Sequence, residues 1–156
     1  MIIRRAEKKD ISDVLRLLSQ VLELHADIRP DIFIPGTTKY SAEELAEIFA
    51  DDLRPVYVAV EGDTLLGYAF CQFTEPAFAS TMVPRKTFYI DDLCVDKSAR
   101  GKHVGKSLFE HVKEQAAQLG CYEVTLNVWE GNDAAYDFYK AMGMKTKETQ
   151  MEYILS

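Results

Sequence analysis

The sequence of 156 residues is poor in the features that build disulfide-bonded, membrane-embedded or metal-binding proteins. Its three cysteines, Cys71, Cys94 and Cys121, lie far apart, so neither a disulfide framework nor a cysteine zinc site is indicated. No H-E-x-x-H or other ligand cluster points to a metal. No apolar run approaches the roughly 20 residues that cross a bilayer, and Met1–Arg5 turns charged at once, unlike a signal peptide. We therefore expect an untargeted cytoplasmic protein with reduced thiols.

Positive charge is also scarce. Lys and Arg number 18 against 25 Asp and Glu, which gives a formal net charge of −7. An acidic protein has no general attraction to nucleic-acid phosphate or to anionic lipid, so we expect neither nucleic acid nor membrane as a partner. A cationic partner suits this charge better.

What is present is the composition of an ordinary globular protein, with 47% hydrophobic and 28% charged residues. Without a long linker, low-complexity block or repeat, residues 1–156 are expected to form a single domain. The periodic segments predict an α/β mixture around one sheet with mixed strand directions. Strands are expected over residues 2–6, 56–60, 65–73, 87–95, 122–128 and 150–155. Glu61-Gly62-Asp63 is expected to form a hairpin turn between the second and third of these strands. Helices are expected after Asp10, after the capping box Ser41–Glu44, over residues 104–119 and over residues 132–142.

The most informative junction is the basic turn over residues 100–107, which joins an expected strand to an expected helix. Unpaired N–H groups and the positive end of a helix favour a bound anion at such a place. Gly101 and Gly105 would let a phosphate approach the backbone closely. The basic side chains of this turn, the densest cluster in an acidic chain, are Arg100, Lys102, His103 and Lys106.

Three phosphate-binding motifs compete for this turn. Gly105-Lys106-Ser107 fits the end of a Walker A loop, but the first glycine that the loop requires falls on Arg100. The dinucleotide fingerprint G-x-G-x-x-G is absent. The third motif is the turn that binds coenzyme A, and a P-loop nucleotide-binding protein stays open as an alternative.

Residues 88–143 resemble the acyl-CoA-binding core of the GNAT superfamily of N-acetyltransferases, whose turn has the form Q/R-x-x-G-x-G/A. Arg100 and Gly105 match its first and last positions, and His103 stands where the family usually has glycine. Upstream, Ile90–Val95 resembles the family strand whose backbone pairs with the pantetheine arm. Downstream, the family pattern N-x-x-A-x-x-F-Y-x-x-x-G is matched at Asn132, Ala135, Phe138, Tyr139 and Gly143.

The resemblance implies a GNAT-like α/β (α+β) fold, with a central mixed, mostly antiparallel sheet of about six to seven strands flanked by about four helices. It also implies transfer of the acetyl group of acetyl-CoA to a primary amine by direct attack in a ternary complex, without a metal. Many relatives pair as dimers, so a homodimer is the default expectation. The residues that the resemblance implies in acetyl-CoA binding are Leu93, Cys94, Val95, Arg100, Gly101, Lys102, His103, Val104, Gly105, Lys106, Asn132 and Tyr139.

The catalytic residues implied by the resemblance are Tyr139 and Asp91. Tyr139 matches the family tyrosine that protonates the departing sulfur, and a phenol suits a thiolate whose pKa is roughly 8.5–10. Asp91 stands where some relatives hold a base, and water is the alternative proton acceptor. Strand side chains alternate, so Asp91 is expected on one face with Leu93 and Val95. The implied oxyanion donor is a backbone N–H near Val95.

The resemblance implies that residues 24–40 cover the acceptor amine, and Trp129 is either a lining residue of that pocket or a packing residue. His25 and His111 are expected to be packing or surface histidines. Cys94 should face away from the donor, which argues against an acyl-enzyme. The net charge favours a cationic acceptor such as a polyamine, an aminoglycoside-like amine or a protein lysine. The rival class is a non-catalytic acyl-CoA-binding module that senses acyl-CoA or regulates a partner.

Overall fold

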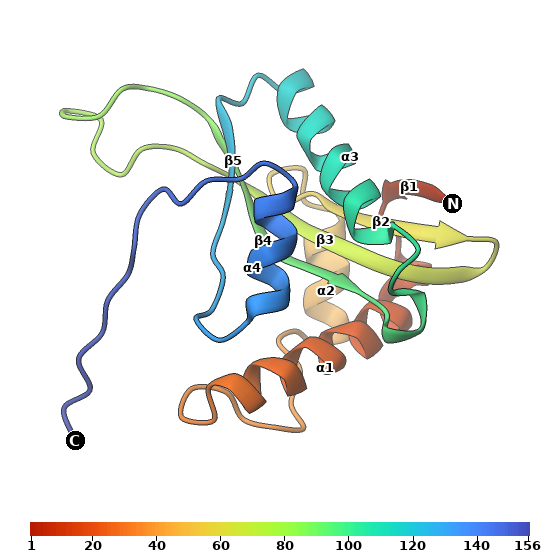
Figure 1. Ribbon diagram of the computed structural model, residues 1–156. Coiled ribbons are helices and arrows are strands. Elements are labelled where there is room, and N and C mark those ends of the chain that lie inside the picture. Colours follow the sequence, from red (N-terminus) through yellow and green to blue (C-terminus); the bar gives the residue numbers. More distant parts are fainter.

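The computed structural model describes residues 1–156 and is built around one five-stranded sheet in the order β1-β2-β3-β4-β5 (Figure 1). Neighbouring strands are antiparallel except β4 and β5, which run parallel. A parallel pair needs a crossover connection, and the third helix supplies it. The predicted mixed, mostly antiparallel fold is confirmed. The strands are β1 (Ile2–Arg5), β2 (Val56–Glu61), β3 (Thr64–Thr74), β4 (Thr87–Val95) and β5 (Glu123–Leu126).

Helices cover both faces of this sheet (Figure 1). The first two pack on one face and the last two on the other. None of them combines the length and hydropathy that spanning a bilayer would require. The four helices are α1 (Ile11–Ile28), α2 (Ala42–Phe49), α3 (Val104–Gln118) and α4 (Asp133–Ala141), with short 3-10 turns at Lys8–Asp10 and Lys97–Ala99.

Alternation along the strands divides the apolar core into two layers. Along β2, Val56 and Val58 are buried towards α1 and α2, whereas Tyr57 and Ala59 are buried towards α3. Since both faces of the central strands are covered, these strands are continuous apolar runs in the sequence.

Local sequence signals place several element ends. The Ser41 hydroxyl accepts a hydrogen bond from the Glu44 N–H at 3.1 Å, and the Glu44 carboxylate accepts one from the Ser41 N–H at 3.0 Å, which is the predicted capping box at the start of α2. Gly62, with φ of 61°, makes the predicted hairpin turn between β2 and β3. The β4 strand has the predicted bounds.

The predicted last strand over residues 150–155 does not form within this chain, so the sheet has five strands rather than six or seven. Residues 145–156 make no backbone hydrogen bond and run away from the body of the molecule (Figure 1). A strand needs a partner edge, and no strand of this chain pairs with this segment. β5 is also shorter than predicted, because it pairs with β4 only over Thr87–Ile90.

Candidate functional site

The site begins where β4 and β5 separate. The two strands pair from Thr87 opposite Glu123 to Ile90 opposite Leu126, after which β5 ends and β4 continues to Val95. From Asp91 onwards, the edge of β4 on the β5 side has no strand partner. Exposed edge groups of this kind pair readily with an extended amide chain.

An open cleft of about 2770 Å³ extends from this edge to the turn before α3 and to α4. It brings together segments 91–95, 100–106 and 132–139, which lie apart in the sequence. Every residue predicted to bind the donor lines it except Lys102, whose side chain is exposed outside the cleft. Both predicted catalytic residues, Tyr139 and Asp91, also line it.

The turn before α3 offers a run of free backbone donors. None of the N–H groups from Arg100 to Lys106 donates a hydrogen bond within the chain, and α3 begins at Val104 without a side-chain cap. The first N–H groups of a helix point out of its N-terminal end, where they favour an anion. The Val104 side chain is buried in the core, so this residue can contribute only its backbone N–H.

His103 is the one non-glycine residue with a positive φ, at 61°. This left-handed conformation suits glycine, and a residue with a Cβ loses about 1–2 kcal/mol in it. His103 therefore holds a backbone conformation that suits glycine, the residue that the resemblance leads one to expect at this position. At Gly105, an added Cβ would lie 3.3 Å from Cζ of Phe138, so glycine allows α3 to approach α4 closely.

The α4 helix presents Asn132 and Tyr139 to the cleft. The Asn132 side-chain oxygen accepts a hydrogen bond from the Ala135 N–H at 3.3 Å, so it caps the helix. Tyr139 is half-buried against Phe138 and Phe109, with ring centroids 5.1 Å and 6.1 Å away. Burial raises the pKa of Tyr139 well above its ordinary value of 10.0, and the nearby Asp92 carboxylate raises it further. The phenol is therefore protonated at neutral pH, as a proton donor must be.

Asp92 is a site residue to which the sequence analysis gave no role. Its Oδ2 accepts a hydrogen bond from the Tyr68 hydroxyl at 2.6 Å, and burial raises its pKa from 3.8 to about 6. A perturbed carboxyl group in a cleft is typical of functional sites. The only signal for it in the sequence was an acidic residue inside an apolar strand. Its partner Tyr68 could not be predicted, because the contact depends on the pairing of β3 with β4.

Simple alternation fails at Asp91. Phe70 pairs with Asp92 and Cys71 with Ile90, which leaves Asp91 as an extra residue in a β-bulge. Its carboxylate forms an ion pair with the ammonium group of Lys39, in the segment before α2. Alternation predicted that Asp91 would share a face with Leu93 and Val95, and this prediction is wrong. Leu93 and Val95 pack towards α3, whereas the bulge turns Asp91 away from them.

Aromatic side chains line the far end of the cleft, within the region predicted to meet the acceptor. The Phe33 ring lies 5.2 Å from the His25 ring and 5.4 Å, edge-on, from Trp129. Burial lowers the pKa of His25, so the imidazole is mainly neutral at pH 7. On the other side of the sheet, His111 packs edge-on against Tyr57 at 4.9 Å. Both histidines thus have the packing role that was predicted.

Cys94 faces away from the predicted donor site, as alternation predicted. Its sulfur lies 3.8 Å from the carbonyl oxygen of Leu17 on α1, and burial raises its pKa to about 12. A thiol in this state is a poor nucleophile. Cys94 can contact a bound donor only through its backbone.

Asp96 connects α1 to the turn before α3, which is called the donor turn below. It is buried and forms an ion pair with Arg16, and its Oδ1 accepts a hydrogen bond from the Ser98 N–H at 3.1 Å. The bond from Arg16 lowers the pKa of Asp96 to about 2. These contacts fix the start of the turn that leads to Arg100.

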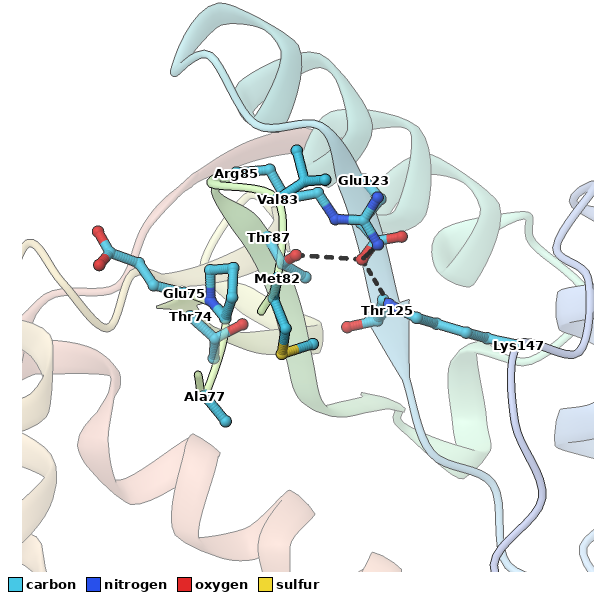
Figure 2. A pocket seen from close by; sticks show the side chains of 11 residues that line it. Thr74, Glu75, Ala77, Met82, Val83, Arg85, Thr87, Glu123, Thr125 and Lys147 are labelled. Atoms are coloured by element: carbon cyan, nitrogen blue, oxygen red, sulfur yellow. Dashed lines mark hydrogen bonds and ion pairs between the residues drawn. The ribbon is translucent and has the colours of Figure 1, made fainter. Parts of the chain in front are cut away.

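A smaller pocket of about 400 Å³ lies at the opposite end of β5 (Figure 2). In its wall, Glu123 accepts a hydrogen bond from Thr87 at 3.1 Å and one from Lys147 at 2.6 Å. Arg85 lies 3.6 Å from the same carboxylate. The bond from Lys147 is the main cause of the lowered pKa of Glu123. Glu123 is therefore paired with two cationic side chains, and its bond with Lys147 attaches the residues that follow α4 to β5. No group of three or more His, Cys, Asp or Glu side chains is placed to hold a metal ion.

Known proteins share both the fold and the sequence pattern. A model of the Acetyltransferase (GNAT) family matches residues 18–144. The thialysine N-epsilon-acetyltransferase of Bos taurus is 27% identical over 153 residues, covering 92% of this chain and 83% of that protein. The glucosamine 6-phosphate N-acetyltransferase of Trypanosoma brucei brucei is 28% identical over 154 residues, covering 96% and 92%. The crystal structure of a mutant BH1408 protein from Bacillus halodurans matches with a TM-score of 0.94 and 32% identity, over 100% of both chains.

Proposed function

This chain belongs to the GNAT acetyltransferase family and is an N-acetyltransferase, and we propose that it moves the acetyl group of acetyl-CoA, the donor of this family, to a primary amine by direct attack. One observation carries the proposal: the unpaired edge of β4 leads into the free N–H groups of the turn before α3. The proposal treats residues 1–156 as one N-acetyltransferase domain in the cytoplasm, where its three free thiols would stay reduced.

The β4 edge and the turn suit the two ends of the donor. Leu93 and Val95 offer backbone groups to the amides of a pantetheine arm, as an added strand would use them. The N–H groups of Val104, Gly105 and Lys106 suit the pyrophosphate. Exposed cationic side chains surround this position although the chain as a whole carries a net charge of −7. The local positive charge would attract the anionic donor to this end of the cleft.

Tyr139 is proposed as the general acid. It lines the cleft beside the β4 edge and is protonated at neutral pH, because burial raises its pKa. A departing thiolate of CoA would take its proton from the phenol as the carbon–sulfur bond breaks. Solvent then returns a proton to the phenolate. A backbone N–H near Val95 is proposed to stabilise the oxygen of the tetrahedral intermediate.

Asp91 is proposed to receive the acceptor amine, with water as the alternative proton acceptor. Its carboxylate pairs with a primary ammonium group, that of Lys39, and this pairing supports an amine-binding role for Asp91. An entering amine would displace Lys39 and lose a proton to Asp91 or to water. The neutral nitrogen then forms the bond to the acetyl carbon, and Tyr139 supplies the proton that leaves with the sulfur.

The acceptor is proposed to be cationic: a polyamine, an aminoglycoside-like amine or a protein lysine. Two carboxylates, Asp91 and Asp92, line the cleft, and aromatic rings of Phe33 and Trp129 lie at its far end. Carboxylates and aromatic faces both favour a cation. Screening by salt should therefore raise the KM for the acceptor, and a KM independent of ionic strength would argue against a cationic acceptor.

Initial rates test the proposal directly. Release of free CoA thiol is followed with acetyl-CoA and a panel of polyamines, aminoglycosides and lysine peptides. Direct attack predicts intersecting double-reciprocal lines, whereas an acyl-enzyme would give parallel lines. Tight binding of acetyl-CoA without turnover of any amine would favour the non-catalytic sensor instead.

A further inference from the structure

One lysine of this chain lies where the acceptor amine is proposed to bind. Lys39 belongs to the irregular segment between α1 and α2, and its ammonium nitrogen is 2.5 Å from Oδ2 of Asp91. No other lysine forms an ion pair with β4. Thr37, Thr38 and Lys39 border the same cleft as Asp91 and Tyr139. The chain therefore brings a primary amine of its own to the proposed base.

The cleft joins the two faces of the sheet at this point. Leu18 and Val21 of α1 border it from one face, and Tyr139 of α4 borders it from the other. Because β4 and β5 separate after Ile90, an amine on the α1 side can meet a donor on the α4 side between the two strands. Lys39 approaches the cleft from the α1 side.

The proposed position of the donor brings its thioester to Asp91. Along acetyl-CoA, the pyrophosphate is followed by the two amides of the pantetheine arm and then by the thioester. With the pyrophosphate at the turn before α3 and the amides on Val95 and Leu93, the arm runs back along β4 towards Asp91. The acetyl group then lies beside the ion pair between Lys39 and Asp91.

We propose that Lys39 is itself an acceptor, so that without a free amine the protein transfers the acetyl group of acetyl-CoA to its own Lys39. This self-acetylation rests on the proposed function, because it uses the same donor and the same catalytic groups. It adds a covalent modification site to the chain, with the ε-nitrogen of one lysine as the atom that is modified.

The reaction is balanced by the groups already described. Burial lowers the pKa of Lys39, but the Asp91 carboxylate raises it by more, so the amine is protonated at neutral pH. It loses a proton to Asp91 or to water, and the nitrogen then forms a bond to the acetyl carbon. The carbon–sulfur bond breaks, and the sulfur takes a proton from Tyr139. The products are ε-N-acetyl-lysine, free CoA thiol and one proton released to solvent.

The surroundings of Lys39 allow the ion pair to be given up. The Lys39 side chain is 47% exposed, and its backbone N–H and carbonyl make no backbone hydrogen bond. A partly exposed ion pair contributes little to the stability of a fold. Acetylation removes the positive charge and ends the pairing, which leaves the Asp91 carboxylate free for a cationic acceptor.

Mass spectrometry tests the proposal by locating the transferred acetyl group. The full chain, freed of earlier acetyl groups by a lysine deacetylase, is incubated with isotope-labelled acetyl-CoA and no amine. We expect Lys39 to gain the label about tenfold faster or more than Lys8, an exposed lysine outside the cleft, because only Lys39 has a positioned acid and base. The rate constant should not depend on protein concentration. Equal labelling of the two lysines, or a rate constant that rises with protein concentration, would overturn self-acetylation.

Variants show whether the protein catalyses this transfer. Lys39→Arg keeps a cation beside Asp91 and should lower total labelling to the rate seen at Lys8. Lys145→Arg, at an exposed position bordering the same cleft, is the matched control and should label Lys39 at the wild-type rate. Tyr139→Phe should slow the labelling of Lys39 by about 10²-fold and leave that of Lys8 unchanged. If Tyr139→Phe leaves the Lys39 rate unchanged, the acetylation is uncatalysed and the proposal is wrong.

Release of free CoA thiol with the amine panel separates self-acetylation from the proposed function. Turnover of an amine by a protein whose Lys39 stays unlabelled would overturn self-acetylation and leave the proposed function standing. Turnover of an amine together with labelling of Lys39 would support both. Absence of both reactions would overturn both.

Discussion

The Asp92 carboxylate on β4 raises the pKa of the Tyr139 phenol on α4, although 46 residues separate them in the sequence and burial is the larger cause of the shift. The two groups meet because β4 and α4 both line the cleft that opens where β4 and β5 separate. One group is a protonated donor and the other a carboxylate that titrates near neutral pH. Their proximity places acid–base chemistry beside the proposed donor site.

Replacing Tyr139 with phenylalanine should slow catalysis without weakening donor binding. Loss of a general acid typically lowers kcat by about 10²-fold or more, whereas the ring that packs on Phe109 is kept. Steady-state kinetics and the Kd for acetyl-CoA are the readouts. Tyr136→Phe, at an exposed position on the same helix, is the control. An unchanged kcat for Tyr139→Phe would remove Tyr139 from the mechanism.

The KM for the acceptor should depend on pH through Asp92. Burial raises the Asp92 pKa to about 6, so its negative charge is present above pH 6 and is lost as the pH falls below it. If the acceptor is cationic, its KM should rise below pH 6 by several-fold. In Asp92→Asn this dependence should vanish and KM should stay high, while Asp63→Asn, in the hairpin turn, should behave like the wild type. A pH-dependent KM in Asp92→Asn would assign the effect to another group.

Position 103 should tolerate glycine and reject a β-branched residue. His103 has φ of 61°, where glycine is unstrained. His103→Gly is therefore expected to keep the free energy of unfolding within about 1 kcal/mol of the wild type, because relief of strain offsets the greater entropy of the unfolded chain. His103→Val should lose about 1–3 kcal/mol. Urea unfolding measures both, and equal stability of the two variants would show that the turn is not strained.

Acid should weaken the link between α1 and the donor turn. Asp96 has a pKa of about 2 against an ordinary 3.8, a lowered native value that stabilises the fold above about pH 4. That contribution is lost as the pH falls from about 4 towards 2. Because Arg16 is half-exposed and solvent screens the ion pair, we expect this contribution to the free energy of unfolding to be on the order of 1 kcal/mol. Arg16→Gln should lower the unfolding free energy at pH 7 and flatten its fall with acid. A fall with acid as steep as in the wild type would contradict this role.

Local patterns made much of this fold predictable. The bounds of β4, the hairpin at Gly62 and the capping box at Ser41 depend on neighbouring residues, and all three were predicted. The donor turn was equally predictable, because the glycines and cations that form it lie close together in the sequence.

Other features depend on contacts between distant segments. The bulge at Asp91 arises from the register of β3 against β4, and the Lys39 ion pair comes from a segment 52 residues away. Tyr68 reaches Asp92 by the same strand pairing. The strand predicted at residues 150–155 does not form, because an alternating pattern does not supply the partner edge that a strand needs.

The most direct test of the account is thermal unfolding with acetyl-CoA, with Mg²⁺-ATP in parallel. At about 100-fold excess over its Kd, a bound ligand adds about 2.7 kcal/mol, which raises the Tm of a chain of this size by roughly 5–10 °C. The free N–H groups of the turn and the open edge of β4 predict this shift with acetyl-CoA and none with Mg²⁺-ATP. A shift with Mg²⁺-ATP alone, or no shift at millimolar acetyl-CoA, would contradict the donor site.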